Sequence, residues 1–248
     1  MSRERPSDDH ELEALAPFER EALAIHWLER AALELRVGRS FEAIARTLSE
    51  LGAPEVLQRL ARRAIDDEHR HHALCVEVAS RFAGRLLEPP LPLPFAPPVH
   101  LGVSESARRH FWVLGQCSFN ETFASVVLET SLAHASGGLA RRALRELLSD
   151  EVDHARIGWA YAAGLSRAER VELQPRLLSV LRANVRAWRE TPRHVMRGEA
   201  AMAHGVVTPA LIDGSLRTAL QELVLPGLDQ LGFDVAPLAR WVSEGAPT

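Results

Sequence analysis

A proline-rich segment near the middle of the chain restricts its fold more than any other feature. Residues 87–98 include six prolines, at positions 89, 90, 92, 94, 97 and 98. Proline has no backbone N–H and its ring clashes with the preceding helical turn, so this segment is predicted to be extended rather than helical. At about 3 Å per residue it can span roughly 40 Å, the length of a helix pair. The segment therefore predicts a long extended connection, here called the tie, between two structural units.

On both sides of the tie the sequence is typical of long helices. Ala, Leu, Glu and Arg dominate, and apolar residues recur every three or four positions. Four helices are predicted, over residues 17–50, 54–83, 105–135 and 139–164. Short turns within each pair and one long connection between the pairs predict an all-α fold, a four-helix bundle with a crossover between its second and third helices. This is the connectivity of ferritin-like folds.

The rest of the chain is predicted to extend this bundle. Residues 1–15 are expected to form a flexible N-terminus, residues 16–165 the bundle, and residues 166–248 a helical extension packed on it. Within the extension, helices are expected over about 168–190 and 208–231. A chain of 248 residues, 46% of them apolar, is near the upper size for a single core, which favours one domain with appendages.

Composition narrows the classes of function. The net charge is -4 and no basic patch stands out, so the sequence gives no sign of a nucleic-acid partner. No stretch is long and apolar enough for a membrane span, and the charged N-terminus is unlike a signal peptide. Two cysteines are too few for a disulfide scaffold. We therefore expect a cytoplasmic protein.

A Glu-x-x-His motif occurs twice, once in the second helix of each predicted pair. Glu68 precedes His71, and Glu151 precedes His154, by three residues. This spacing places both side chains on one helix face, where they can present an oxygen and a nitrogen to one ion. A single match would be weak evidence, because glutamates are common on solvated helix faces. The repetition at matching places makes a metal site the better interpretation.

The first helix of each pair supplies one more carboxylate at a matching distance. Glu34 lies 34 residues before Glu68, and Glu121 lies 30 residues before Glu151. Four carboxylates and two imidazoles can then meet on the bundle axis, as in di-iron and di-manganese carboxylate bundles. Burying such carboxylates without cations costs several kcal/mol each, and metal binding removes that cost. The predicted metal-binding and catalytic residues are Glu34, Glu68, His71, Glu121, Glu151 and His154.

Neighbouring residues compete for these ligand positions. The competitors are His69, His72, Glu29 and Glu42. His71 is preferred because the second motif has the three-residue spacing, and Glu34 is preferred because its distance to Glu68 fits better.

Six further residues lie near the motifs with roles that the sequence leaves open. They are Asp67, Asp150, Cys75, Cys117, Glu129 and Tyr161. The two aspartates are either acceptors for the ring N–H of a ligand histidine or surface acids. Both cysteines are expected to pack in the core, and Glu129 is expected to face solvent rather than a channel. The tyrosine is expected to be a packed core ring rather than a redox-active or gating residue.

Several short stretches resemble one protein family. The Leu-Gly-Ala-Pro turn at 51–54, Asp67-Glu68-x-x-His71 and Asp150-Glu151-x-x-His154-Ala155 resemble ferritin-like proteins that are common in myxobacteria. The likeness covers about residues 20–165 and implies the six ligands already named. The chain differs at 35–38, where Leu-Arg-Val-Gly stands in place of His-Ala-Ser-Val. It also lacks a histidine one turn before Glu151, and so lacks the seventh ligand of the arylamine N-oxygenase branch.

The resemblance implies chemistry with O2. Members of the superfamily include oxygenases, desaturases, N-oxygenases and ferroxidases. The leading hypothesis is a non-haem di-iron oxidoreductase that uses two Fe ions and O2 to hydroxylate, N-oxygenate or desaturate a small organic substrate. Mn/Fe and Mn centres, an external electron donor and a monomer or homodimer are left open. The long C-terminal extension, which an iron-storage cage would not need, is expected to form a substrate pocket.

Two other hypotheses remain open. One is a ferroxidase or iron-handling protein without an organic substrate. The other is an interaction module that kept the fold and lost the metals.

Overall fold

Helices account for nearly all of the ordered secondary structure of this chain. The computed structural model describes residues 11–91, 93–191 and 199–246, and these ranges contain no strand. The all-α prediction is therefore confirmed for them. The main elements are α2 (Pro17–Glu50), α3 (Glu55–Ala83), α4 (Glu105–Val113), α5 (Glu121–His134), α6 (Gly138–Ala163), α7 (Arg167–Glu190), α8 (Glu199–Ala203), α9 (Pro209–Thr218), α10 (Leu225–Gln230) and α11 (Ala236–Ser243), with the π-helices η1 (Leu114–Asn120) and η2 (Ala219–Val224).

Local sequence signals set most helix ends. Pro17 is the first residue of α2, where its missing N–H costs nothing. Gly84 ends α3 in the left-handed conformation, with a φ of 68°. Ser104 precedes α4, and its hydroxyl oxygen accepts a hydrogen bond from the backbone N–H of Ala107. These ends agree with the predicted ones.

The third predicted helix is interrupted by a π-helical stretch that the sequence did not predict. η1 separates α4 from α5 and ends at Asn120, directly before Glu121. α6 packs closely against this stretch at Gly158, where a Cβ atom would lie 2.3 Å from the backbone nitrogen of Ser118. Only glycine permits this approach. Wider turns of this kind occur often at functional sites, and this one directly precedes a predicted ligand.

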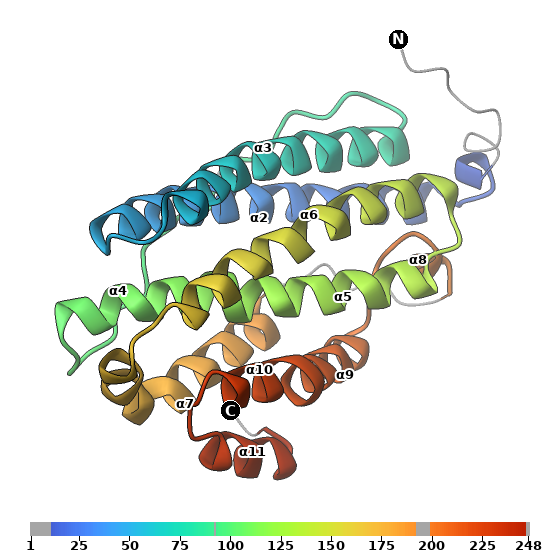
Figure 1. Cartoon of the computed structure of the whole chain (residues 1–248). Helices are drawn as coiled ribbons and strands as arrows, with labels where there is room; N and C mark the ends of the chain where they lie inside the picture. The colour runs from blue at the N-terminus through green and yellow to red at the C-terminus, as the bar shows by residue number, and fades with distance from the viewer. Residues whose placement is uncertain (1–10, 92, 192–198, 247–248) are drawn as a thin grey trace.

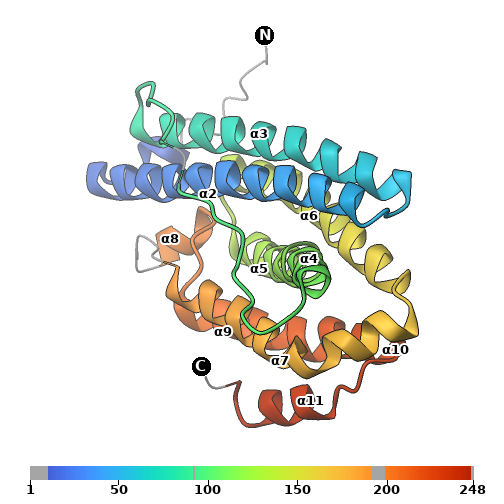
Figure 2. The ribbon, with the colours of Figure 1, turned by 90° about the vertical axis from the view of Figure 1, so that its left-hand side faces the viewer.

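The long helices pair as hairpins. α2 packs along α3, α5 packs along α6, and α3 also contacts α6. Figure 1 shows the first pair at one side of the molecule and α4, η1 and α5 running beneath it. The connection from α3 to α4 crosses the outside of α2, as Figure 2 shows, and contains no helix over residues 86–91 and 93–100. The indole N–H of Trp112 donates to the carbonyl oxygen of Pro98 at 2.7 Å and fastens its end.

The C-terminal residues form a further set of helices on the α4–α5 side. α7 contacts α4 and η1, and α9 contacts α5. Figure 2 shows α7, α9 and α11 beneath these helices, on the side opposite α2 and α3. The predicted segments 168–190 and 208–231 correspond to α7 and to the run from α9 to α10, whereas α8 and α11 were not predicted.

The predicted flexible N-terminus lies mainly outside the described residues, which begin at residue 11. In the described part, Leu12 is buried in the core. No described helix has the length and apolar character that crossing a membrane requires.

The hydrophobic core is divided into two clusters. One includes Phe41 of α2 and Ile157 of α6, and the other includes Trp27 of α2 and Leu144 of α6. Along both helices the predicted ligands fall between the two clusters. A polar layer therefore crosses the bundle between two apolar layers.

Candidate metal centre

Six buried side chains from four helical segments meet in this polar layer. They are Glu34, Glu68, His71, Glu121, Glu151 and His154, and none is more than 8% exposed. The structure thus brings together every residue that the sequence predicted as a ligand. Their role in binding metal remains a prediction.

The six side chains form two overlapping groups. Glu34 and His71 lie with Glu68 and Glu151 in the first, and in each group one ligand atom per residue lies within 4.8 Å of the others. Glu121 and His154 lie with the same two glutamates, Glu68 and Glu151, in the second. Each group could hold a metal ion. The two shared glutamates, one from each Glu-x-x-His motif, are placed to bridge a pair of ions.

Each histidine is oriented by an aspartate from the opposite motif. The ring Nε2 of His71 donates to Asp150 Oδ2 at 3.0 Å, because a carboxylate can only accept. On the other side, Nε2 of His154 lies 3.5 Å from Asp67 Oδ2. In both rings Nδ1 faces the shared glutamates, and in His154 it lies 3.2 Å from Glu68 Oε1. A proton held on Nε2 leaves the Nδ1 lone pair free for an ion.

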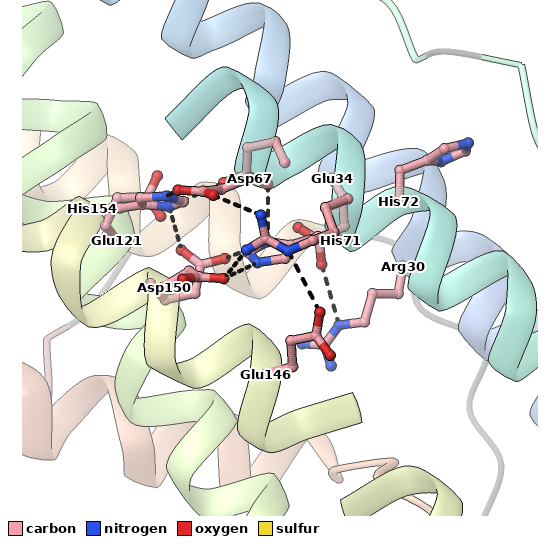
Figure 3. A network of polar contacts seen from close by, with 12 residues as sticks. Arg30, Glu34, Asp67, His71, His72, Glu121, Glu146, Asp150 and His154 are labelled. Carbon is pink, nitrogen blue, oxygen red and sulfur yellow. Dashed lines mark hydrogen bonds and ion pairs between the residues drawn. The ribbon is translucent and has the colours of Figure 1, made fainter. Parts of the chain in front are cut away.

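One arginine joins the two aspartates. Arg70 donates to Asp67 Oδ1 at 2.8 Å and to Asp150 Oδ2 at 2.5 Å, and its Nε lies 3.5 Å from Glu146. Figure 3 shows Asp67 and Asp150 in one polar network with His71 and His154. The two aspartates are therefore hydrogen-bond acceptors beside the site rather than isolated surface acids. The guanidinium of Arg70 therefore links the two aspartates that contact the imidazoles.

Glu34 and Glu121, on the side away from the histidines, are held by other polar residues. Gln116 and Asn120 of η1 both donate to Glu121 Oε1. Gln116 is fixed in turn by Ser40, whose hydroxyl donates to its Oε1 at 2.8 Å. Glu34 lies 3.6 Å from the guanidinium of Arg30, one turn earlier on α2. The π-helix therefore supplies both the position of Glu121 and its hydrogen-bond donors.

Burial and the charges of neighbouring side chains shift the pKa values of these groups away from their ordinary values. Burial, helped by the charge of Glu68, raises the pKa of Glu34 to about 8, and burial also raises that of Glu121. Burial alone would lower the pKa of His71, but the nearby carboxylates of Glu68, Glu34 and Glu151 raise it to about 9. Burial would raise the pKa of Glu151, but the neighbouring imidazoles of His154 and His71 outweigh it and lower the pKa to about 2. Protons thus take up part of the charge that a divalent ion would neutralise.

Several buried polar atoms of the cluster have no hydrogen-bond partner in the described part of the chain. They are both carboxylate oxygens of Glu68, Oε2 of Glu151, Nδ1 of His71 and both ring nitrogens of His154. Buried polar atoms without a partner are rare and costly. Because most of these atoms face the centre of the cluster, the site fits a pair of metal ions. Four carboxylates with one imidazole per ion form a donor set that suits iron or manganese.

A cavity of about 820 Å³ reaches the cluster on the side of Glu34 and Glu121. Glu34, Glu121 and Glu151 line it, whereas Glu68 and the two histidines do not. Its walls come from α2, η1 and α5 of the bundle and from α7 and α9 of the C-terminal extension. The extension therefore forms part of a pocket, as the sequence predicted.

The competing residues are placed elsewhere. His69 and Glu42 are exposed, and Nδ1 of His72 donates to the carbonyl oxygen of Ala31 at 2.9 Å. Glu29 is half-buried and lines the cavity but belongs to neither group.

The two cysteines, Glu129 and the tyrosine, whose roles were also left open, lie where the sequence led us to expect them. Cys75 and Cys117 are buried in the core, and Glu129 is exposed. Tyr161 is buried, with its hydroxyl 2.6 Å from Nδ1 of His110.

Sequence reasoning missed Arg70 as a link between the aspartates and Gln116 as a partner of Glu121. Arg70 stands inside the first motif, which was the available signal, but its role depends on which helix lies opposite. Gln116 carries no motif and reaches Glu121 only through the π-helical turn.

Comparison of the chain with known protein families, curated proteins and solved structures finds no match. Function is therefore inferred from the site itself.

Proposed function

We propose that this chain is a ferritin-like di-iron carboxylate protein that uses O2 to oxidise a small organic substrate. The observation that carries the proposal is the pair of four-residue groups sharing Glu68 and Glu151. The helical hairpins and the long connection between them agree with a ferritin-like bundle. Two ferrous ions at such a site supply electrons for the reduction of O2.

The side chains have separate tasks in this proposal. Glu34 and His71 would hold one ion, Glu121 and His154 would hold the other, and Glu68 and Glu151 could contribute to both. Asp150 accepts a hydrogen bond from Nε2 of His71, and Asp67 lies 3.5 Å from Nε2 of His154, so both carboxylates favour a proton on Nε2. Buried apolar layers on both sides exclude water, which protects a reactive centre from side reactions.

The cavity favours substrate oxidation over iron storage. An iron-handling protein needs an ion path, whereas a cavity of about 820 Å³ lies within the range of roughly 300–1,000 Å³ that is typical of small-molecule sites. It ends at Glu34 and Glu121, so a bound molecule would lie beside the metal ligands. Ferroxidase activity without an organic substrate remains the alternative.

Iron content and oxygen use test the proposal together. The metal-free protein is loaded anaerobically with ferrous iron, excess iron is removed, and bound iron and O2 consumption are measured. We expect two ions per chain, O2 consumption after mixing, and no further iron uptake during repeated cycles. Accumulation of tens of ferric ions per chain would instead support iron storage. Absence of bound iron would support an interaction module.

A further inference from the structure

The cavity beside the carboxylates has features that limit what it can bind. It lies between α2 on one side and α7 and α9 on the other, and residues 95–98 and 100 of the crossover also line it. Ala183 and Ala187 of α7 line the cavity and remain exposed, so this helix face is covered by no other part of the described chain. The space is therefore built between the bundle and its extension.

Much of the cavity wall is aliphatic. Ile44 of α2, Val127 of α5 and Val180 of α7 approach it from three directions, and Ile212 of α9 adds a fourth. Transfer of apolar surface from water to such a wall is favourable by about 25 cal/mol per Å². The main body of a bound molecule should therefore be apolar.

The arginines of the wall are paired or exposed to solvent. Arg189 donates to Asp213 Oδ1 at 2.9 Å and to the carbonyl oxygen of Ala246 at 2.6 Å. Arg30 is paired with Glu34. Arg36 also lines the cavity but is exposed to solvent. In the described chain, the lining thus offers no buried, unpaired cation for a carboxylate, sulfonate or phosphate.

The polar groups on the η1 and α7 walls are uncharged amides. Gln116, Asn120 and Asn184 all line the cavity, and Asn184 donates to the carbonyl oxygen of Val180 at 3.0 Å. The indole N–H of Trp188 donates to Asn120 Oδ1 at 2.8 Å and fixes that side chain. Amides suit neutral hydroxyl, carbonyl or amide groups.

We infer that the substrate is a mainly apolar organic molecule without an anionic group, carrying an uncharged hydrogen-bonding group and held between α2 and α7 with one end at Glu34 and Glu121. That the bound molecule is a substrate rests on the proposed function. That such a molecule binds in this cavity does not. Amphiphiles with an anionic head are disfavoured, because burying an unpaired charge in this wall is costly.

Two related dyes test the inference in the metal-free protein. N-phenyl-1-naphthylamine is neutral, and 8-anilino-1-naphthalenesulfonate has the same ring system with an added sulfonate. Fluorescence titration should show the neutral dye binding at least tenfold more tightly than the anionic one. Equal or tighter binding of the anionic dye would overturn the inference.

A matched pair of variants, each replacing an alanine of α7 by phenylalanine, locates the bound dye. Ala187→Phe fills the cavity and should weaken binding of the neutral dye at least tenfold, while Ala168→Phe, at an exposed position of α7 outside the lining, should leave it unchanged. Ala183→Phe repeats the test one turn earlier, and thermal melting checks that each variant is folded. Unchanged dye affinity in both cavity variants would also overturn the inference.

The dye result and the iron result are independent. Dye binding is measured without metal, and iron content without dye. Failure of one therefore leaves the other readable.

Discussion

The two sides of the glutamate and histidine cluster differ in how their side chains are held and in what can reach them. On the histidine side, Asp67 and Asp150 contact the imidazoles, and Arg70 ties both aspartates together. On the carboxylate side, Glu34 and Glu121 face a cavity of about 820 Å³. The closed side fixes ligand orientation, while the open side leaves room for a substrate. The aspartates that contact the imidazoles and the cavity beside the carboxylates therefore lie on opposite faces of one cluster.

Removing a shared ligand should have the largest effect, because it belongs to both sides. Glu68→Ala deletes a carboxylate that lies in both four-residue groups. We expect iron to fall from two ions per chain to none, measured by elemental analysis after loading. Glu77→Ala, at an exposed position of the same helix, is the matched control and should keep both ions.

For comparison, Glu121→Ala should release one ion and retain helix content by circular dichroism. Unchanged iron in both ligand variants would refute the ligand assignment.

The closed side can be tested through its arginine. Arg70→Gln removes the cation that holds both aspartates, so both imidazoles should lose orientation together. We expect metal affinity to fall by about 10–100-fold for both ions, measured by competition with a chelator. Arg62→Gln, exposed on the same helix, is the control. Loss of affinity at one ion alone would show that Arg70 does not couple the two halves.

Acidity should weaken metal binding on both sides. In the metal-free protein the pKa is raised to about 8 for Glu34 and to about 9 for His71, so both hold a proton at neutral pH that an ion must displace. Metal affinity should therefore rise with pH between about 6 and 9, by about tenfold per pH unit for each proton displaced. Titration calorimetry in buffers of different ionisation enthalpy measures the protons released. Affinity independent of pH would contradict the assigned protonation.

The smallest effect is expected at the single tyrosine, which belongs to neither side. Tyr161→Phe removes the hydrogen bond to His110, and unfolding free energy should fall by about 1 kcal/mol in chemical denaturation. Iron content and O2 consumption should be unchanged. A large loss of O2 consumption with iron retained would instead assign the tyrosine a redox role.

Most of the helical framework could be predicted because its signals are local. Pro17, Gly84 and Ser104 act at the helix ends where they stand. The π-helix before Glu121 was missed, because its wider turns depend on packing against α6 at Gly158 rather than on a local motif. Interruptions inside helices are therefore harder to predict than helix ends.

The grouping of the six side chains could be predicted because the chain repeats the motif that contains them. Two motifs with a three-residue spacing, each preceded by a glutamate, pointed to six side chains that the structure brings together. The roles of Asp67 and Asp150 were left open, since each aspartate serves the histidine of the other motif. Such crossed pairing depends on how α3 and α6 face each other, and sequence spacing does not contain that information.

Crystals of the iron-loaded protein, measured with X-rays at the iron absorption edge, would test the central claim most directly. We predict two anomalous peaks in each chain, one near Nδ1 of His71 and one near Nδ1 of His154, with Glu68 and Glu151 between them. Peaks elsewhere, or a fully loaded chain with none between these side chains, would contradict the account.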